Sequence, residues 1–376
     1  MVIFLYKNTM KAFKKLEPRQ NILSITPYKG GNEKQDDDQN IINLASNESP
    51  LGASPVAIAA YKDACSNLHL YPDGASHLLR EEISNRYGFD PKKIVCGSGS
   101  DELIDILVRS FSGSGDEVLY SEHGFLMYPI AAKSAGATPK KIIETNYKAD
   151  VESIISSITN STKIILLANP NNPTGSYLTK YELEFLCKEI PKNVLLVIDA
   201  AYAEYVLVDD YDSGFQLVEK YKNVVMTRTF SKLYGLAGLR VGWCYSSVEV
   251  SGILNRVRQP FNVNMPAQVA ACAALKDIEH ENKIRNLNSK CLPMLSDGLK
   301  SLGLEVLPSI ANFILVRFAN SNQAKLIIEY LYSNKILVRD VSPYGLDNYV
   351  RITVGTEEHV NILLDLISDF KLNERN

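Results

Sequence analysis

Between about residue 92 and residue 246, short aliphatic runs alternate with segments of helical periodicity. The strand-like runs are KIVCGS, EVLYSE, KKIIET, KIILLAN, NVLLVID, NVVMTRTF and RVGWCYS. Segments with spaced apolar positions, such as DELIDILVRSF and KYELEFLCKEI, lie between several of them. Because the runs carry Val, Ile and Leu almost without interruption, we expect strands that are buried on both faces. This alternation predicts an α/β fold in which helices cover both faces of a mostly parallel sheet.

The pattern changes after about residue 276. A long helical stretch is followed by the strand-like runs NFILVRF, KILVRD and YVRITVG, which are interspersed with the helical segments QAKLIIEYLYS and HVNILLDLISDF. A chain of 376 residues is long enough for two or three cores. We therefore predict an N-terminal arm and part of a small domain at residues 1–65, a large domain at 66–276 and a smaller α+β domain at 277–376.

Charge and hydropathy exclude several classes of partner. The formal net charge is only −3, so no nucleic acid or anionic membrane surface is indicated. No apolar run approaches the roughly 20 residues that span a bilayer. The apolar start of MVIFLYKNTMKAFKK is too short for a signal peptide. We expect a cytoplasmic protein.

No metal-ligand pattern is found in the sequence. The six cysteines include no C-x-x-C pair and no histidine cluster accompanies them, so we expect reduced thiols with structural roles. The segment GGNEKQDDDQN contains Asp36, Asp37 and Asp38, but it lacks the glycine and the distal glutamate of a calcium loop. We predict a solvated turn there and no bound metal.

Lys232 is the first candidate catalytic residue. It lies in RTFSKLYGLAGLRVGW, directly after the run NVVMTRTF, and in parallel sheets chemistry gathers beyond the carboxyl ends of strands. A lysine amine is nucleophilic only when it is neutral, and burial beside apolar groups lowers its pKa. A Schiff-base lysine has this requirement, whereas a lysine taken alone is usually a solvated surface charge.

Asp199 ends the apolar run NVLLVID and would lie at the same edge of the sheet. A buried carboxylate needs a cationic partner. A protonated pyridine nitrogen is such a partner, and the pairing makes pyridoxal phosphate a better electron sink. The alternative is an aspartate that caps a helix or a turn. Tyr202, three residues later, is either a hydrogen-bond donor to the ring's phenolate oxygen or a packing tyrosine.

Two loops offer groups that could bind the ring oxygen and the phosphate of pyridoxal phosphate. In ANPNNPTGSYL the prolines stiffen a turn that would present the Asn172 amide to the ring oxygen, although the turn alone is an ordinary connection. In CGSGSDELI a helix begins near Ser100, and the N–H groups at a helix N-terminus bind phosphate. The third glycine of a dinucleotide fingerprint is absent. Thr229, Ser231 and Arg240 would complete the phosphate site.

Together, the order and spacing of these motifs resemble the fold-type I pyridoxal-phosphate aminotransferases, from ILSITPYKGG to YVRITVGTEE. The resemblance implies a large domain with a mostly parallel seven-stranded sheet between helices, and a smaller α+β domain. It implies Lys232, Asp199 and Tyr202 as catalytic residues, with pyridoxal 5'-phosphate also held by Gly99, Ser100, Asp101, Phe125, Asn172, Thr229, Ser231 and Arg240. Tyr71, in YPDG, is similar to the tyrosine that reaches the phosphate of the neighbouring subunit, which implies a homodimer with shared active sites.

Within the family, the sequence resembles the histidinol-phosphate aminotransferases through NLASNESPLGASP, LYPDGASHLLR, GSGSDELID, DAAYAEY and ILVRD. The implied reaction is amino transfer between L-histidinol phosphate and 2-oxoglutarate, in histidine biosynthesis. By the same resemblance, Arg351 binds the α-carboxylate of glutamate and Arg339 the substrate phosphate, with Tyr28 and Asn47 lining the substrate pocket. The alternative for Arg339 is an ion pair with neighbouring Asp340.

Three alternative functions stay open at this point. An aminotransferase of aromatic amino acids differs in pocket shape rather than in motifs, and a phosphothreonine-type decarboxylase, a lyase, shares nearly every cofactor residue. A non-catalytic scaffold is the third, although all residues expected for the chemistry are present. One departure from the family pattern also occurs. SEHGFLMY replaces the usual Pro-Thr-aromatic opening before Phe125, which predicts a changed loop geometry with stacking retained.

Overall fold

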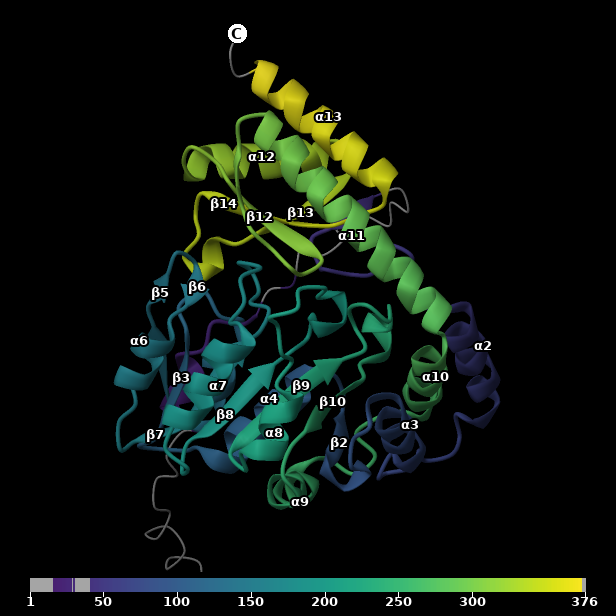
Figure 1. Cartoon of the computed structure of the whole chain (residues 1–376), viewed down its shortest axis with the longest axis vertical. Coiled ribbons are helices and arrows are strands. Elements are labelled where there is room, and N and C mark those ends of the chain that lie inside the picture. The colour runs from purple at the N-terminus through teal and green to yellow at the C-terminus, as the bar shows by residue number, and fades with distance from the viewer. Residues whose placement is uncertain (1–15, 29, 31–40, 374–376) are drawn as a thin grey trace, which may run out of the picture.

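The computed structural model describes residues 16–28, 30 and 41–373 of the chain. The opening segment 1–15, which we predicted not to be a signal peptide, and the acidic turn with Asp36, Asp37 and Asp38 lie outside the described residues. Two main sheets lie one above the other along the long axis of the molecule, the larger one below in Figure 1. No helix in the described part is long and apolar enough to cross a membrane.

The larger sheet has seven strands in the order β2-β10-β9-β8-β7-β3-β4. β10 runs antiparallel to β2 and β9, and the other pairs are parallel. The predicted mostly parallel seven-stranded sheet is therefore confirmed, and each predicted run overlaps one of its strands. The strands are β2 (Ile94–Gly97), β3 (Glu117–Ser121), β4 (Thr138–Ile142), β7 (Thr162–Ala168), β8 (Leu195–Asp199), β9 (Val224–Thr229) and β10 (Gly242–Tyr245).

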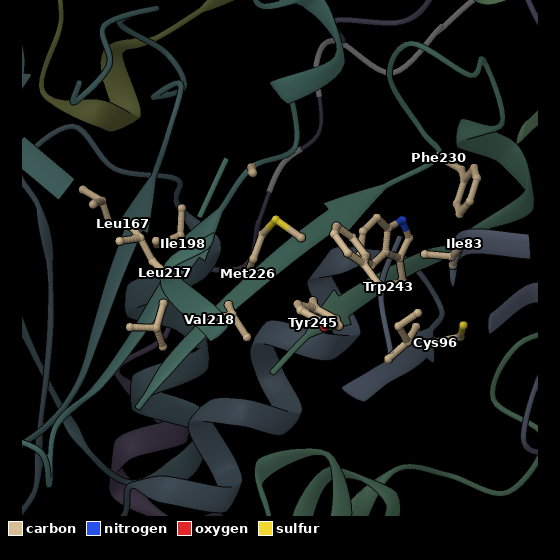
Figure 2. Close-up of a cluster of buried hydrophobic side chains, with 14 of the residues drawn as sticks. Ile83, Cys96, Leu167, Ile198, Leu217, Val218, Met226, Phe230, Trp243 and Tyr245 are labelled. Atoms are coloured by element: carbon tan, nitrogen blue, oxygen red, sulfur yellow. The ribbon is translucent and has the colours of Figure 1, made fainter. Parts of the chain in front are cut away.

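Side chains on these strands alternate between two buried clusters, one on each face of the larger sheet. In β7, Ile164 and Leu166 pack in one cluster, while Ile165 and Leu167 pack in the other. This burial on both faces explains the unbroken aliphatic runs. Figure 2 shows part of the second cluster around Trp243. The first cluster includes residues of α4 (Ser100–Phe111), α5 (Met127–Ala135) and α9 (Val248–Val257), and the second includes residues of α3 (His77–Tyr87), α7 (Lys180–Glu189), α8 (Phe215–Lys220) and α10 (Met265–Lys276).

The smaller sheet has the order β1-β13-β14-β12-β11, and β1 joins it in parallel with β13. Three helices pack against it around a core that includes Leu295, Leu331 and Leu363. One of these helices, α11, begins next to α10 and so connects the two sheets (Figure 1). The elements are β1 (Ile42–Leu44), β11 (Glu305–Leu307), β12 (Phe313–Arg317), β13 (Ile336–Asp340), β14 (Tyr349–Thr353), α11 (Ile278–Ser301), α12 (Ser321–Ser333) and α13 (Glu357–Asn373). The domain boundaries after residues 65 and 276 stay predictions.

The remaining regular elements are short. They are α1 (Gln20–Leu23), α2 (Pro55–Ala64), α6 (Val151–Ser156), the hairpin of β5 (Glu144–Thr145) and β6 (Lys148–Ala149), and 3₁₀ turns that include η3 (Ala203–Tyr205) and η5 (Ser342–Tyr344). All six cysteines are free thiols, and all except Cys65 are buried.

Candidate active site

A cavity of about 270 Å³ opens beyond the carboxyl ends of β7, β8 and β9, facing the smaller sheet. Its walls bring together most of the residues that were predicted from the sequence: Tyr28, Asn47, Ser100, Asp101, Phe125, Asn172, Asp199, Tyr202, Thr229, Ser231, Lys232, Arg240, Arg339 and Arg351. Two predicted residues lie outside this lining. Gly99 lies behind Arg240, and Tyr71 is 82% exposed and stacks on Phe261.

Asp199 is the last residue of β8, and its carboxylate is buried. The Tyr128 hydroxyl donates to Oδ2 at 2.9 Å, and the Thr227 hydroxyl donates to Oδ1 at 3.1 Å. Burial raises the pKa of Asp199 to about 6, although both hydrogen bonds act in the opposite direction. In the part of the chain that the structure describes, no basic side chain forms an ion pair with this carboxylate. Asp199 can therefore serve a cationic group in the cavity.

Lys232 lies in the loop after β9, and its Nζ donates to the Ser46 carbonyl oxygen at 3.0 Å. The same nitrogen lies 5.8 Å from the centre of the Tyr202 ring. Burial, together with the positive charge of Arg351, lowers the pKa of Lys232 to about 8. The amine therefore loses its proton more readily than a surface lysine, as nucleophilic attack requires.

Donors for an anion gather where α4 begins. Ser100 opens this helix, whose first N–H groups have no partner within the helix. The Arg240 guanidinium donates from Nη1 to the Ser231 hydroxyl at 3.1 Å and forms an ion pair with Asp101 at 3.3 Å. Gly99 adopts φ +83°, and a Cβ there would lie 2.6 Å from Arg240 Nη2. The glycine thus leaves the space that the guanidinium occupies.

Thr229 completes this group from the end of β9. Its hydroxyl donates to Ser231 Oγ at 3.0 Å and accepts from the Ser231 N–H at 3.1 Å. The Ser231 hydroxyl, the Arg240 guanidinium and the N-terminus of α4 therefore line the same cavity, and Thr229 holds Ser231 in place. This set of donors fits a phosphate monoester.

Two arginines reach the cavity from the smaller sheet. Arg339 on β13 and Arg351 on β14 occupy opposite positions in the register of the two strands, and both are buried. Arg351 donates from Nη1 to Asn172 Oδ1 and from Nη2 to the Ala45 carbonyl oxygen at 2.5 Å. Its Nε is buried without a hydrogen-bond partner among the described residues. Such a buried donor fits an acceptor supplied by a bound anion.

The loop before Phe125, for which we predicted a changed geometry, is held by contacts of His123. His123 donates from Nδ1 to the Tyr344 carbonyl oxygen at 2.9 Å, since a carbonyl can only accept. Its backbone N–H donates to Glu144 Oε1 at 3.1 Å. The Phe125 ring lies edge-on to Tyr128, with 5.9 Å between the ring centres. The loop is therefore tied to η5, and Phe125 lines the cavity; the changed geometry and the stacking of Phe125 on the cofactor stay predictions.

Comparison with known proteins decides the family. The profile of the family described as aminotransferase class I and II matches residues 39–367. The chain belongs to this family. It is 46% identical over 354 residues to a histidinol-phosphate aminotransferase of Rhodospirillum centenum, covering 94% of this chain and 98% of the relative. It is 47% identical over 355 residues to one of Paramagnetospirillum magneticum, with the same coverage of both chains.

A solved structure gives the same assignment for this class I and II aminotransferase. The crystal structure of histidinol-phosphate aminotransferase from Sinorhizobium meliloti in complex with pyridoxal-5'-phosphate superposes with a TM-score of 0.87 at 27% identity. It covers 96% of this chain and 98% of that chain. The predicted fold class is thereby confirmed for the whole chain rather than for the larger sheet alone.

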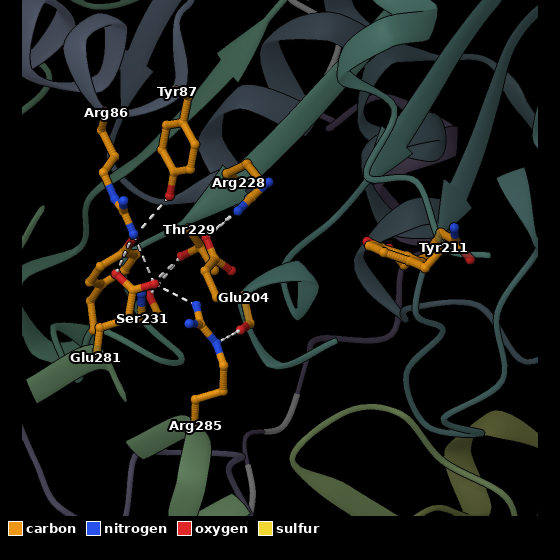
Figure 3. A network of polar contacts seen from close by, with 11 residues as sticks. Arg86, Tyr87, Glu204, Tyr211, Arg228, Thr229, Ser231, Glu281 and Arg285 are labelled. Atoms are coloured by element: carbon orange, nitrogen blue, oxygen red, sulfur yellow. Dashed lines mark hydrogen bonds and ion pairs between the residues drawn. The ribbon is translucent and has the colours of Figure 1, made fainter. Parts of the chain in front are cut away.

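The aminotransferase also contains a buried ion pair close to its cavity (Figure 3). Arg228, the residue before Thr229, donates from Nε and Nη2 to Glu204 Oε1 at 3.0 and 2.7 Å. Glu204 follows Tyr202 by two residues, in η3. The pair therefore connects the loop after β8, which carries Tyr202, to the end of β9, which leads to Lys232.

A second buried carboxylate extends this network to α11. Glu281 forms ion pairs with Arg86 at 3.1 Å and with Arg285 at 2.5 Å. Arg285 also donates from Nε to the Glu204 carbonyl oxygen at 2.9 Å. Figure 3 shows these side chains converging from α3, α11 and η3. The helix that connects the two sheets is thus anchored to the loops that carry the site.

Sequence reasoning missed three contributors to the site of this aminotransferase. Tyr128 and Thr227 orient Asp199, and the Ser46 carbonyl receives Lys232. A signal exists for Tyr128, because it follows Phe125 by three residues at the start of α5, so both side chains can face the same direction. Thr227 is recognisable only from the register that places it opposite Asp199.

Proposed function

We propose that this enzyme transfers the amino group of L-histidinol phosphate to 2-oxoglutarate with pyridoxal 5'-phosphate as its cofactor, in the cytoplasmic synthesis of histidine. One observation carries the substrate assignment: Arg339 and Arg351 both line the cavity that holds Lys232 and Asp199. The names of the similar proteins support the same reaction.

The residues of the site fit the proposed cofactor group by group. The donors around Ser231 and Arg240 suit its phosphate, and the carboxylate of Asp199 suits its ring nitrogen. When bound, pyridoxal phosphate supplies an aldehyde that bonds to amines and a ring that withdraws electrons from the substrate carbon. Asn172 and Tyr202 face the same cavity and are assigned to the ring oxygen.

The side chains of the protein then perform three tasks. Lys232, with a pKa of about 8, would carry a proton from the substrate α-carbon to the carbonyl carbon of the cofactor. Asp199 keeps a negative charge beside the ring nitrogen, held by Tyr128 and Thr227. Arg351 holds the carboxylate of glutamate, so that the bond to be broken keeps a fixed direction.

The two substrates make different demands on one pocket. Histidinol phosphate carries a phosphate monoester and no carboxylate, whereas glutamate carries two carboxylates. Arg339 and Arg351 lie opposite each other on neighbouring strands, so one pair of guanidiniums can serve both anions. Asp340 is the residue that the sequence offered as an alternative partner for Arg339. Its carboxylate accepts hydrogen bonds from the backbone N–H and the hydroxyl of Ser342, at 2.8 and 2.9 Å.

We also propose that two copies of the chain form the active unit. Tyr71 is 82% exposed and lies outside the cavity of its own chain, with its ring stacked on Phe261 at 4.7 Å. Leu68 and Leu70 beside it are also more than half exposed, at 65% and 56%. This apolar surface supports a subunit contact in which Tyr71 reaches the phosphate of the cofactor in the neighbouring subunit.

A half-reaction screen tests the proposal. Purified holoenzyme is mixed separately with histidinol phosphate, glutamate, phenylalanine and phosphothreonine, and the visible spectrum of the cofactor is followed. We expect histidinol phosphate and glutamate to convert the spectrum to that of the amine form. Faster conversion by phenylalanine would assign an aromatic aminotransferase. Carbon dioxide release from phosphothreonine without a keto acid would assign a lyase. A protein that stays colourless with excess pyridoxal phosphate would refute the proposed cofactor.

A further inference from the structure

Asn47 makes a contact that its predicted place in the substrate pocket does not explain. The residue is 1% exposed, and its Nδ2 donates to the Tyr202 hydroxyl at 2.9 Å. Its backbone adopts φ +55°, a left-handed conformation that asparagine tolerates better than most residues. The Asn312 amide donates to its carbonyl oxygen at 3.1 Å. The Asn47 side chain is therefore held against Tyr202 from several directions.

Thr353 sets the orientation of the Asn47 amide. The Asn47 backbone N–H donates to Thr353 Oγ1 at 3.0 Å, and the Thr353 hydroxyl donates to Asn47 Oδ1 at 3.0 Å. A hydroxyl has a single hydrogen to donate, and an amide oxygen can only accept. With Oδ1 bound to Thr353, the NH₂ group of Asn47 faces Tyr202.

The direction of the Tyr202 hydrogen follows from this arrangement. The hydroxyl oxygen already accepts a hydrogen bond from Asn47, so its own hydrogen must point elsewhere. No acceptor for it is found among the residues that the structure describes, and Tyr202 lines the cavity. The charged and titratable groups that act on Tyr202 are Lys232, Arg351, Asp199, Tyr128, Tyr205 and Tyr344.

We propose that Thr353 and Asn47 are positioning residues, which orient the Tyr202 O–H toward the ring oxygen of the cofactor. The inference rests on the proposed function, because the ring oxygen belongs to pyridoxal phosphate. Thr353 follows Arg351 by two residues on β14, on the same face of the strand. The strand that binds the substrate is therefore linked through Asn47 to the tyrosine that contacts the cofactor.

The pH midpoint of the visible absorbance of the substrate-free holoenzyme tests this role. A donor to the anionic ring oxygen stabilises the deprotonated chromophore, so loss of that donor raises the midpoint. We expect Tyr202→Phe to raise it by about one pH unit and Thr353→Val by roughly half a unit. Valine keeps the shape of threonine and lacks its hydroxyl. Thr353→Ser, which keeps the hydroxyl, should leave the midpoint unchanged.

Two further variants separate positioning from a structural effect. In a Tyr202→Phe background, Thr353→Val should add no further shift, because both changes act on one hydrogen bond. An equal shift in that background, or an unchanged midpoint in Thr353→Val alone, would overturn the inference. If Thr353→Val does not fold, Asn47→Gly supplies the test, because glycine suits the left-handed backbone at φ +55° and removes the amide without adding a charge. The midpoint should rise as expected for Thr353→Val, and an unchanged midpoint overturns the inference. A wild-type protein without a visible band refutes the proposed function instead.

Discussion

Removing the negative charge of Glu204 should strongly destabilise the protein. The side chains of Glu204 and Arg228 are only 3% and 7% exposed, and Oε1 receives both N–H groups of the arginine. Glu204→Gln keeps the shape and one oxygen acceptor but leaves the guanidinium without its counter-charge. Breaking a buried pair from one side costs about 3–5 kcal/mol. The rings of Tyr87 and Trp243 lie 5.4 and 5.7 Å from the guanidinium carbon and partly stabilise it. We therefore expect a loss of about 3 kcal/mol in the free energy of unfolding.

Urea denaturation of the cofactor-free protein, followed by circular dichroism and by tryptophan fluorescence, measures this loss. The two probes must coincide before a single free energy of unfolding is assigned. The double variant Glu204→Leu/Arg228→Met should cost much less than the sum of the two single changes, since it leaves no unpaired charge. Glu305→Gln is the matched control, because Glu305 pairs with Arg317 on the surface with side chains 53% and 49% exposed.

The control should change the unfolding midpoint very little. If Glu204→Gln behaved like this exposed control, or if the double variant cost the full sum, the buried pair would not carry the stability assigned to it. A lower midpoint that appears only in the presence of cofactor would instead indicate an effect on the site itself.

Three other predictions test individual side chains of the site. Burial lowers the pKa of Lys232 from its ordinary 10.5 to about 8, so between these pH values the unfolded chain binds the proton more readily than the folded one. The cofactor-free enzyme should therefore gain stability as the pH rises through this range. Lys232→Met should lack this gain when urea midpoints are compared. Arg339→Ala should lower kcat/KM for histidinol phosphate ~10- to 100-fold more than for glutamate, and equal losses in steady-state assays would contradict its assignment to the phosphate. Gly99→Ala should raise the Kd for pyridoxal phosphate about tenfold or more in a fluorescence titration, because the residue lies at φ +83° and its new Cβ would lie 2.6 Å from Arg240. Gly113→Ala is the control: its Cβ would meet open space, so the Kd should stay unchanged.

Most strands of the larger sheet were predictable because a local apolar run encodes each of them. The edge strand β4 (Thr138–Ile142) is the exception, since it is mostly not buried and overlaps only the start of KKIIET. A continuous apolar stretch, such as residues 164–168 in KIILLAN, is required when both faces of a strand are buried, so the sequence indicates the burial. The carboxyl-edge placement of Asp199 and Lys232 follows from the same pattern. The roles of these residues toward the cofactor stay predictions.

The parts that were missed depend on register and on distant pairing. Thr227 looks like any threonine in a strand until the pairing of β8 with β9 places it opposite Asp199. The antiparallel direction of β10 is not encoded in its composition. β1 is only three residues long, so its apolar pattern is too short to distinguish from a loop.

The pairing of β1 with β13 has a consequence for how the chain is made. Ile42 and its neighbours are translated long before their partners, Ile336 to Val338. At roughly 5–20 residues per second, ~15–60 s pass between the two events. All strands of the larger sheet have been synthesised by Tyr245, well before that time. The smaller sheet, which carries Arg339 and Arg351, can therefore be completed only after every strand of the larger sheet has been synthesised.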